Sequence, residues 1–411
     1  MEKREIAFSP PDITDAEIKE VIKALKSGWI TTGIRTKTFE KDIAEYCGTS
    51  KAVCLSSATS AMEMTLRILG IGVGDEVITT AYTYTASAAV INHVGAKIVL
   101  VDTKPDSFEI DYDALAEAVT ERTKAIIPVD LGGRLCDYEL IMKILEDKKE
   151  LYHPNNELQE KFERIIVISD CAHGFGAQKK IGNEWRKAGT FADFTCFSFH
   201  AVKNLTTGEG GAVVWKDRQN IDNEELYKKY MLISLHGQSK DAFQKSKLGA
   251  WEYDILNTAY KCNMTDIQAG IGLKQLERYD QILQRRHFII KRYNQLSKSI
   301  GCTYLIHCDE KNISSGHLYL LRIPGIDELQ RNTIIEKLAE QGLATNVHYK
   351  PLPMMTAYKK LGFDIANYPN AYNQYKNELT LPLHTKLTDE DIIYIEKVLP
   401  KCVESYVKGC E

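Results

Sequence analysis

The most informative stretch of this chain is Ser198-Phe-His-Ala-Val-Lys-Asn-Leu-Thr-Thr-Gly-Glu-Gly-Gly211. An apolar, strand-like run at 194–199 leads into it, and a second run at 211–215 follows it. This spacing predicts that Lys203 lies on a Gly-rich turn that joins two strands at the edge of a sheet. Lysine forms a Schiff base with an aldehyde once it has lost its proton, and burial favours that loss. A solvent-exposed lysine in a β-turn is the alternative interpretation.

Strands and helices alternate around this stretch through the first two thirds of the chain. Helix-length segments such as 60–69 and 111–120 separate most of the strands, and the capping box Thr14-Asp-Ala-Glu17 starts an earlier helix. Strands that are buried on both faces and joined by helices predict an α/β fold with a mainly parallel sheet. The predicted strands, which are short apolar runs rich in β-branched residues, lie at 51–55, 76–80, 97–102, 124–130, 164–170, 194–199 and 211–215.

The pattern changes after residue 216 and predicts two domains. The larger domain would span residues 1–260 and carry a surface insertion at about 142–163, which contains the polar stretch His153-Pro-Asn-Asn156. The smaller α/β domain would span residues 261–411 and begin with a long helix, which Thr265-Asp-Ile-Gln268 caps. The remaining elements predicted in it are strands at 317–323 and 344–349 and helices at 327–341 and 387–399.

Composition and charge limit the possible partners. The chain has 52 Lys and Arg against 56 Asp and Glu, a net charge of −4, so basic surfaces for nucleic acid or anionic membranes are not expected. No run approaches the roughly 18 apolar residues of a membrane helix, and the start of the chain lacks the apolar core of a secretion signal. The ten cysteines form no C-x-x-C pair, which favours reduced thiols in the cytoplasm and predicts no metal site.

A carboxylate ends one of the predicted buried strands. The run Ile165-Ile-Val-Ile-Ser-Asp170 leads directly into Cys171-Ala-His173. Asp170 would lie at the carboxyl end of a parallel strand, where α/β proteins bind their ligands. There it could keep the nitrogen of an aromatic ring protonated. Alternatively, Asp170 caps a helix or starts a turn, and His173 is a structural histidine.

Two further segments follow strand ends. Ser56-Ser-Ala-Thr-Ser-Ala61 lies between a predicted strand and a helix, where backbone N–H groups can bind phosphate. Plain N-capping by Thr59 or Ser60 is the alternative. Ala81-Tyr-Thr-Tyr-Thr-Ala-Ser87 offers an aromatic side chain, Tyr84, that could stack on a flat ring or simply pack. A phosphate site, an aromatic side chain, an aspartate and a lysine at one sheet edge together predict a site for pyridoxal 5′-phosphate (PLP).

The sequence resembles the DegT/DnrJ/EryC1/StrS family of sugar-nucleotide aminotransferases, which are PLP enzymes with the aspartate aminotransferase fold (type I). The resemblance extends nearly from end to end, and it implies a large domain with a mainly parallel sheet and a smaller C-terminal α/β domain. The matching segments are Ser27-Gly-Trp-Ile-Thr-Thr-Gly33 with Phe39-Glu40, residues 56–61, Gly72-Val-Gly-Asp-Glu-Val77 with Tyr82-Thr-Tyr84, Gly95-Ala96, Asp170-x-Ala-His173, Ser198-Phe-His-x-x-Lys203, Gly208-Glu-Gly-Gly211, Met264-Thr-Asp-Ile-Gln-Ala269 and Val347-His-Tyr349.

The matching positions imply a role for each residue of the expected PLP site. Lys203 would form the Schiff base and Asp170 would contact the pyridine nitrogen, so these two are the implied catalytic residues. Tyr84 would stack on the ring, and His173 would lie beside its O3′ atom. The implied phosphate ligands are Thr59, Ser60 and Ser198.

The resemblance also implies a homodimer whose active sites are shared between subunits. In the family, a residue near the Met-Thr-Asp segment reaches the phosphate of the neighbouring subunit. Here Tyr260-Lys-Cys-Asn-Met264 stands where many relatives have Asn-x-Arg-Met, so either Lys261 or Asn263 could make that contact. The residues implied to line the sugar site are Thr32, His348 and Tyr349.

Lys203 also separates two activities within the family. Some relatives that remove a hydroxyl group carry histidine at this position, so lysine favours transamination. The implied reaction transfers an amino group from L-glutamate to a 4-keto or 3-keto sugar nucleotide. The Tyr-Lys-x-Asn-Met-Thr-Asp pattern and the segments His236-Gly237 and Asp241-Ala242 look most similar to members that aminate C4 of UDP-linked sugars. Two alternatives stay open: a PLP-dependent sugar dehydratase or other lyase on the same scaffold, and a non-catalytic regulator.

Overall fold

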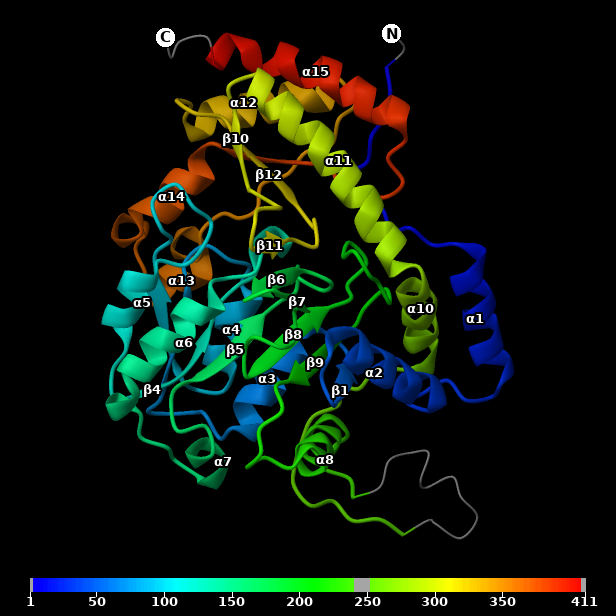
Figure 1. Ribbon diagram of the computed structural model, residues 1–411, viewed down its shortest axis with the longest axis vertical. Helices are drawn as coiled ribbons and strands as arrows, with labels where there is room; N and C mark the ends of the chain where they lie inside the picture. The colour runs from blue at the N-terminus through cyan, green and yellow to red at the C-terminus, as the bar shows by residue number, and fades with distance from the viewer. Residues whose placement is uncertain (1–2, 240–251, 408–411) are drawn as a thin grey trace.

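A seven-stranded sheet with the strand order β1-β9-β8-β5-β4-β2-β3 forms the centre of the molecule in a computed structural model, which describes residues 3–239 and 252–407 (Figure 1). Strand β9 runs antiparallel to both of its neighbours, and the other pairs run parallel. This confirms the predicted α/β fold with a mainly parallel sheet. The strands are β1 (Ala52–Leu55), β2 (Glu76–Thr80), β3 (Lys97–Val101), β4 (Thr123–Ile127), β5 (Ile166–Asp170), β8 (Phe194–Ser198) and β9 (Gly211–Trp215).

Both faces of this sheet are buried, which explains its uninterrupted apolar runs. Along β1, Val53 and Leu55 pack into one apolar cluster, whereas Ala52 and Cys54 pack into another. Helices α3, α4 and α8 contribute to the first cluster, and α2, α5 and α6 contribute to the second. The helices of this part are α1 (Asp15–Lys26), α2 (Ile34–Cys47), α3 (Ala58–Ile68), α4 (Ala86–His93), α5 (Tyr112–Ala118), η1 (Leu131–Gly133), α6 (Tyr138–Asp147), η2 (Lys149–Leu151), α7 (Glu157–Glu160) and α8 (Asn223–Ser234).

The C-terminal part is built around a small antiparallel sheet with the order β10-β12-β13 (Figure 1). A third apolar cluster joins this sheet to its helices. A further small sheet, β11-β6-β7, connects the two parts of the chain, and its polar, partly exposed residues gave no strand signal in the sequence. The elements are β6 (Gln178–Ile181), β7 (Glu184–Lys187), α10 (Asp266–Glu277), α11 (Tyr279–Ser299), β10 (Thr303–Tyr304), β11 (Asn312–Ile313), β12 (Tyr319–Arg322), α12 (Glu328–Glu340), η3 (Leu352–Met354), α13 (Thr356–Lys360), η4 (Ile365–Asn367), α14 (Pro369–Lys376), β13 (Glu378–Leu381) and α15 (Asp389–Val407).

The C-terminal part differs from the prediction in two places. The helical run after Thr265 is two helices, α10 and α11, which meet at Arg278. The strand predicted at 344–349 is wrong, because only a single bridge forms there, between Asn346 and Thr380 of β13. Side chains take the next backbone donors: the Asn346 side chain accepts the N–H of Val347 at 2.8 Å, and Glu378 accepts that of His348 at 2.9 Å.

The domain boundary at residue 260 and the surface insertion at 142–163 stay predictions. Within that insertion, Gln159 is fully buried and its amide donates to the Leu69 carbonyl at 2.7 Å. The segment Asp241-Ala242 lies outside the described residues.

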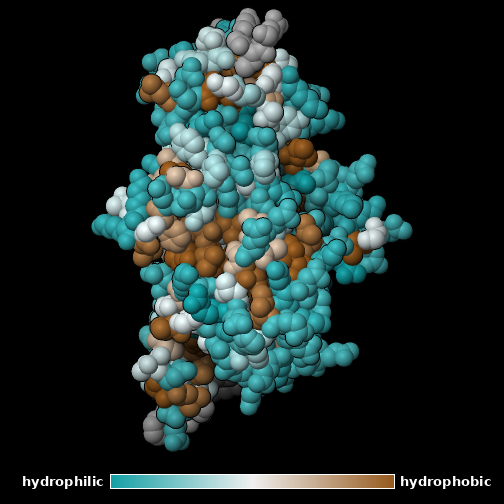
Figure 2. Space-filling model, turned by 90° about the vertical axis from the view of Figure 1, so that its left-hand side faces the viewer, coloured by the Kyte–Doolittle hydropathy of each residue, from teal (hydrophilic) through white to brown (hydrophobic). Residues whose placement is uncertain are grey.

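Apolar side chains remain on the surface in several places. Figure 2 shows one face of the molecule, where hydrophobic residues gather in a band across the middle. On α1, Ile18, Ile22 and Leu25 follow helical spacing and are 50%, 42% and 52% exposed, which is a pattern typical of interaction surfaces. Across the described ranges, none of the helices is both long and apolar enough to cross a membrane.

Candidate active site

One pocket, of about 370 Å³, brings most of the sequence-predicted site residues together. It lies where β5 and β8 end and α3 begins, and the segment 348–349 borders it. This position, at the carboxyl ends of parallel strands, is the usual ligand site of α/β sheets. The predicted residues that line it are Thr59, Tyr84, Asp170, His173, Ser198, Lys203, His348 and Tyr349.

Four residues that the sequence analysis named do not line this pocket. The Ser60 hydroxyl lies 2.6 Å from that of Ser57, in the turn that starts α3. The Asn263 amide donates to the Thr32 hydroxyl at 2.6 Å, and Lys261 donates to the Asn263 side-chain oxygen. Thr32, Lys261 and Asn263 therefore form a separate polar cluster, and a contact from this cluster to a second subunit stays a prediction.

Lys203 lies in the loop between β8 and β9, as its sequence context predicts. Its backbone N–H donates to the His200 carbonyl at 2.8 Å, and the Asn204 amide anchors the loop by donating to the Ser315 carbonyl at 2.8 Å. Burial lowers the pKa of the Lys203 amine to about 8, although the negative charge of Asp170 offsets part of that effect. About a tenth of the amine is then neutral at pH 7, so Lys203 can react as a nucleophile or a base.

Asp170 ends β5 and is buried in the pocket wall, with 5% of its surface exposed. Ser87 donates its hydroxyl to one carboxylate oxygen at 2.6 Å, and the Ala172 N–H donates to the other at 3.2 Å. Burial raises the pKa of Asp170, and these two hydrogen bonds and the charge of Lys203 counter the shift. Among the described residues, no cation forms an ion pair with this carboxylate, so a positively charged ligand group beside it would be strongly favoured.

The start of α3 supplies groups that suit a phosphate. Ser57 is the N-cap residue, and its hydroxyl accepts the N–H of Ser60 at 3.0 Å. The pocket here is lined by Ser57, Thr59 and Ser198, next to the positive end of the helix dipole. Gly211 of β9 allows the helix to lie this close to the sheet, because a Cβ atom at 211 would lie 2.4 Å from the Ser57 carbonyl carbon.

His173 and Tyr349 form a hydrogen-bonded pair on another side of the pocket. The Gly132 N–H donates to Nδ1 of His173 at 3.2 Å, so that nitrogen carries no proton. Burial lowers the pKa of His173 well below its usual range, and the neutral ring therefore carries its proton on Nε2. Nε2 lies 3.1 Å from the Tyr349 hydroxyl and donates to it, which leaves the Tyr349 proton available to a ligand.

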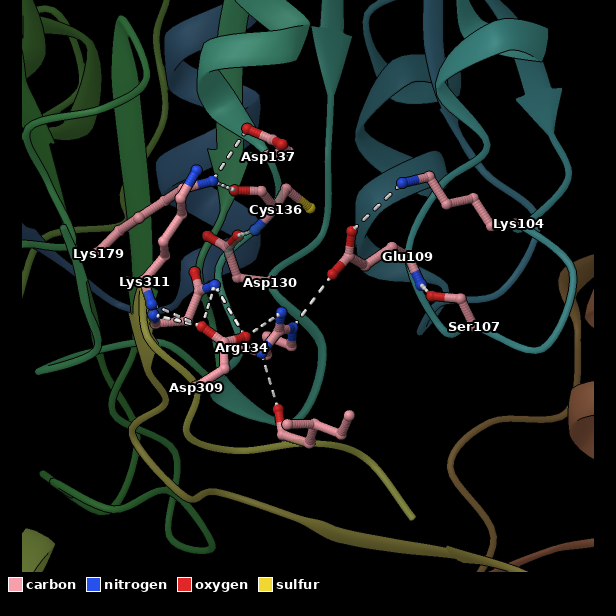
Figure 3. Close-up of polar contacts among 12 residues, drawn as sticks. Lys104, Ser107, Glu109, Asp130, Arg134, Cys136, Asp137, Lys179, Asp309 and Lys311 are labelled. Carbon is pink, nitrogen blue, oxygen red and sulfur yellow. Dashed lines mark hydrogen bonds and ion pairs between the residues drawn. The ribbon is translucent and has the colours of Figure 1, made fainter. Parts of the chain in front are cut away.

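The loop that holds His173 is itself fixed by a polar network around Arg134 (Figure 3). The Arg134 guanidinium contacts Glu109 at 3.2 Å, Asp309 at 2.8 Å and the Ile306 carbonyl at 2.9 Å. These contacts join residues that follow β3 and β4 to the segment before β11. The network supports the pocket without lining it.

Sequence reasoning missed some residues of this site. Ser57 was missed because several hydroxyl residues of the 56–61 stretch are equally suitable phosphate ligands by sequence, and Thr59 and Ser60 were chosen instead. Only the folded turn shows which hydroxyl residues line the pocket. Ser87 is the last residue of the segment 81–87 and lies on the first turn of α4, but the sequence analysis gave it no role, because its contact with Asp170 joins residues that are far apart in the chain. A search for hydroxyl residues near Tyr84 could have found it.

The pocket offers a group for each functional part of PLP. A lysine with a lowered pKa suits the aldehyde, and a helix N-terminus suits the phosphate. A buried carboxylate that forms no ion pair with any described residue suits a protonated ring nitrogen. Tyr84, whose ring centroid lies 5.9 Å from that of Tyr349, offers an aromatic face. Together with the mainly parallel sheet, these groups define a PLP-dependent enzyme of the aspartate aminotransferase fold, type I.

Comparison with known proteins agrees with this class. The model of the DegT/DnrJ/EryC1/StrS aminotransferase family matches residues 11–399, so the chain belongs to this family of PLP-dependent aminotransferases. The spore coat polysaccharide biosynthesis protein SpsC of Bacillus subtilis is 36% identical over 415 residues, which cover 99% of this chain and 98% of that protein.

Solved structures of similar proteins share the fold. The PLP form of Spr1654 from Streptococcus pneumoniae, assigned as a sugar aminotransferase, is 51% identical, with a TM-score of 0.94 over 98% of this chain and 99% of that one. PseC of Helicobacter pylori, an aminotransferase involved in the biosynthesis of pseudoaminic acid, is 30% identical, with a TM-score of 0.84 over 98% of this chain and 100% of that one. This chain is therefore a PLP-dependent sugar aminotransferase by family.

Proposed function

We propose that this enzyme transfers an amino group from L-glutamate to a keto sugar nucleotide, a UDP-linked 4-keto-6-deoxy sugar, and supplies an amino sugar nucleotide for polysaccharide or glycan synthesis. Lys203 carries this proposal, because it combines a pKa of about 8 with a place beside Asp170 in the pocket. The similarity to SpsC, a spore coat polysaccharide biosynthesis protein, and to PseC, an aminotransferase involved in the biosynthesis of pseudoaminic acid, supports the substrate class.

Each catalytic role follows from the position of a side chain. PLP, when bound, supplies a carbonyl group that carries the amino group and a ring that accepts the electron pair of the bond broken at the substrate carbon. Lys203 would hold the cofactor and, once the amino donor has released it, take a proton from the substrate carbon at Nζ and return it. Asp170 would keep the ring nitrogen protonated, and Tyr84 would pack on the ring.

The other lining residues would bind and orient. Ser57, Thr59 and Ser198 would hold the phosphate at the start of α3. Tyr349 and His348 line the pocket on the side of the C-terminal part, where they would contact the sugar. His173 would lie beside the ring oxygen and keep Tyr349 oriented through their 3.1 Å hydrogen bond.

The active unit would be a homodimer with shared active sites. The exposed aliphatic residues of α1 support a second copy as the partner, since such a stripe is unfavourable in water. The polar cluster of Thr32, Lys261 and Asn263 would complete the sugar and phosphate sites of the neighbouring subunit. The described cysteines are free thiols, which supports a reducing compartment, the cytoplasm.

The test is a substrate screen with the PLP-loaded protein. L-Glutamate is supplied with UDP- or dTDP-linked sugars that carry a 4-keto or 3-keto group, and NMR identifies the product. We expect one amino sugar nucleotide for each 2-oxoglutarate formed, with the UDP-linked 4-keto sugar as the best acceptor. Borohydride reduction of the loaded enzyme should leave a pyridoxyl adduct on Lys203.

Two variants control the screen. Lys203→Ala should lower turnover by about 10²- to 10⁴-fold and abolish the adduct, because Lys203 is the only lysine among the described residues that line the pocket. Lys216→Ala removes an exposed lysine at the end of β9 and should behave as the wild type. Loss of water from the sugar without consumption of glutamate would instead identify a lyase, and inertness toward every keto sugar would refute the substrate class.

A further inference from the structure

A fully buried carboxylate lies behind His348, outside the set of residues that the proposed reaction uses. Glu378 belongs to β13, and Thr380, two residues on, lies on the same face of the strand. One carboxylate oxygen of Glu378 lies 2.5 Å from the Thr380 hydroxyl, and the other accepts the backbone N–H of His348 at 2.9 Å. The two oxygens are therefore committed to different partners.

The Thr380 hydroxyl continues this contact to the histidine ring. It lies 2.9 Å from Nδ1 of His348, so Glu378, Thr380 and His348 form a continuous chain of hydrogen bonds. The His348 ring is stacked on Phe8 with centroids 5.5 Å apart, and Tyr82 donates to the His348 carbonyl at 2.9 Å, which fixes both ring and backbone. His348 lines the pocket, and within the described residues no hydrogen bond engages its Nε2.

A hydroxyl group has one proton, so the direction of this chain is determined at its buried end. An ionised Glu378 can only accept hydrogen bonds, so the Thr380 hydroxyl donates its proton to it. The Thr380 oxygen then accepts a hydrogen bond from His348, whose ring carries its proton on Nδ1. Nε2 is then bare and acts as an acceptor. A protonated Glu378 donates to Thr380, whose own proton turns to Nδ1, and the ring proton moves to Nε2, which becomes a donor.

We propose that Glu378, acting through Thr380, sets which ring nitrogen of His348 carries the proton, and so whether His348 offers the pocket an acceptor or a donor. Glu378 is a positioning residue, because two other groups separate it from the ligand. The effect on the sugar rests on the proposed function, whereas the position of the ring proton does not.

Charged and titratable groups from several elements face Glu378. Arg331 of α12 donates to the Glu378 carbonyl at 3.1 Å, and Arg322 of β12 lies directly opposite in the strand register. The phenols of Tyr82 and Tyr349 are close enough to sense its charge.

Burial raises the pKa of Glu378 to about 8, although the hydrogen bonds from Thr380 and the His348 N–H and the charge of Arg331 act in the opposite direction. Both forms of Glu378 are therefore accessible between pH 6 and pH 9.

His348 itself stays neutral over that range. Burial, together with the nearby charge of Lys203, lowers the pKa of His348 to about 3. The neighbouring rings of His173 and His317 are also neutral, because burial lowers their pKa values. The only change expected at His348 is a shift of its proton from one ring nitrogen to the other.

The test measures this proton by ¹⁵N NMR of histidine-labelled holoenzyme, in which His348 is assigned by comparison with His348→Gln. In the wild type we expect Nε2–H at pH 6 and Nδ1–H at pH 9. Glu378→Gln should show Nε2–H at both values, since its carbonyl must accept the His348 N–H and its amide then donates to Thr380. Thr380→Val should abolish the pH dependence, and Thr380→Ser should restore it.

Kinetics of the two half-reactions provide a second readout. At pH 9, Glu378→Gln should raise KM for the keto sugar roughly 3- to 10-fold, the effect of one hydrogen bond, and leave the glutamate half-reaction unchanged. At pH 6 the variant and the wild type should agree. The proposal is overturned if the His348 proton stays on one ring nitrogen at both pH values in the wild type, or if it lies on the same nitrogen in the wild type and in Glu378→Gln at pH 9. An equal loss of activity in both half-reactions would also overturn it. Failure to aminate any sugar would refute the proposed function alone, because the NMR result needs no substrate.

Discussion

At the scale of single residues, Lys203 shows how the site trades stability for reactivity. Its amine is placed where charge is poorly solvated, which is why burial lowers its pKa to about 8. Between pH 8 and pH 10.5 the unfolded chain keeps a proton that the folded chain has lost, so stability rises with pH in this window. Below pH 8 the folded protein bears the full cost of the buried charge.

Replacing Lys203 with methionine should therefore stabilise the cofactor-free protein. We expect a gain of about 1–3 kcal/mol in the free energy of unfolding at pH 7, which shrinks as the pH rises from 8 to 10.5. Urea unfolding at pH 7 and pH 10 measures both values. Lys216→Met, at an exposed position, should show no such pH dependence. A Lys203→Met gain that is the same at both pH values would contradict this account of the pKa.

Sequence reasoning located the reactive residues better than their supports. Lys203 and Asp170 were predicted because few side chains can form a Schiff base or hold a ring nitrogen protonated, so their chemistry limits the choice. Ser57 and Glu378 were not, because a serine in a row of hydroxyl residues and a glutamate in a polar segment have many ordinary roles. Only the folded contacts distinguish them.

At the scale of elements, the contact between α3 and β9 sets the phosphate end of the pocket. Gly211 leaves the space in which the α3 N-terminus approaches the sheet. A Cβ atom there would lie 2.5 Å from the Ala58 nitrogen and 2.7 Å from the Phe197 carbonyl oxygen, both of which are backbone atoms. A side chain at position 211 would therefore force the N-terminus of α3 away from β9.

Gly211→Ala should therefore weaken binding of PLP and of inorganic phosphate. We expect about 10-fold lower affinity and a loss of about 1–3 kcal/mol in stability, because the overpacked helix start is pushed away from the strand. Absorbance titration with PLP and urea unfolding measure the two effects. Gly74→Ala is the matched control: Gly74 has a φ of +93° but open space around it, so it should lose about 1 kcal/mol and bind PLP normally. Equal PLP affinity in both variants would refute the role of Gly211.

The elements of the sheet could be predicted because burial on both faces leaves a simple signal. Val53 and Cys54 pack on opposite sides of β1, and both must be apolar. In β13 the alternation fails, since Glu378 and Thr380 are buried polar residues that hydrogen-bond to the His348 segment. One of these contacts, from Glu378, also takes the backbone N–H of His348, so the strand predicted at 344–349 does not form. The prediction failed where buried polar residues support the pocket.

At the scale of the whole molecule, Arg134 ties the sheet region to the C-terminal part. Although burial opposes the shift, hydrogen bonds from the Lys311 N–H and from Arg134 hold the pKa of Asp309 down to about 2. A carboxylate with a lowered pKa stabilises the fold above pH 4, and the contribution is lost as the pH falls through 2. The loop of residues 131–134 carries the Gly132 N–H that holds His173.

Arg134→Gln should loosen this connection. We expect a loss of about 1–3 kcal/mol at pH 6, and a smaller difference from the wild type at pH 3, where Asp309 begins to lose its charge. Urea unfolding gives the energies, and hydrogen exchange should quicken in residues 306–318. Arg186→Gln breaks an exposed ion pair with Glu184 and should change neither quantity. An Arg134→Gln loss of equal size at pH 3 would mean that the ion pair contributes nothing.

The antiparallel strand β9 also affects when the two ends of the pocket, the Lys203 loop and the N-terminus of α3, form during folding. It pairs with β8 across the short Lys203 loop, which is a local contact that closes at little entropic cost. Its pairing with β1, which places the α3 N-terminus, joins segments from distant parts of the chain and is intrinsically slower. We therefore expect a newly made chain to form the lysine side first and to retain PLP only after the long-range pairing is complete. Because PLP binds only the folded chain, its binding stabilises that state by mass action. Depletion of PLP should therefore lower the yield of folded enzyme as well as its activity.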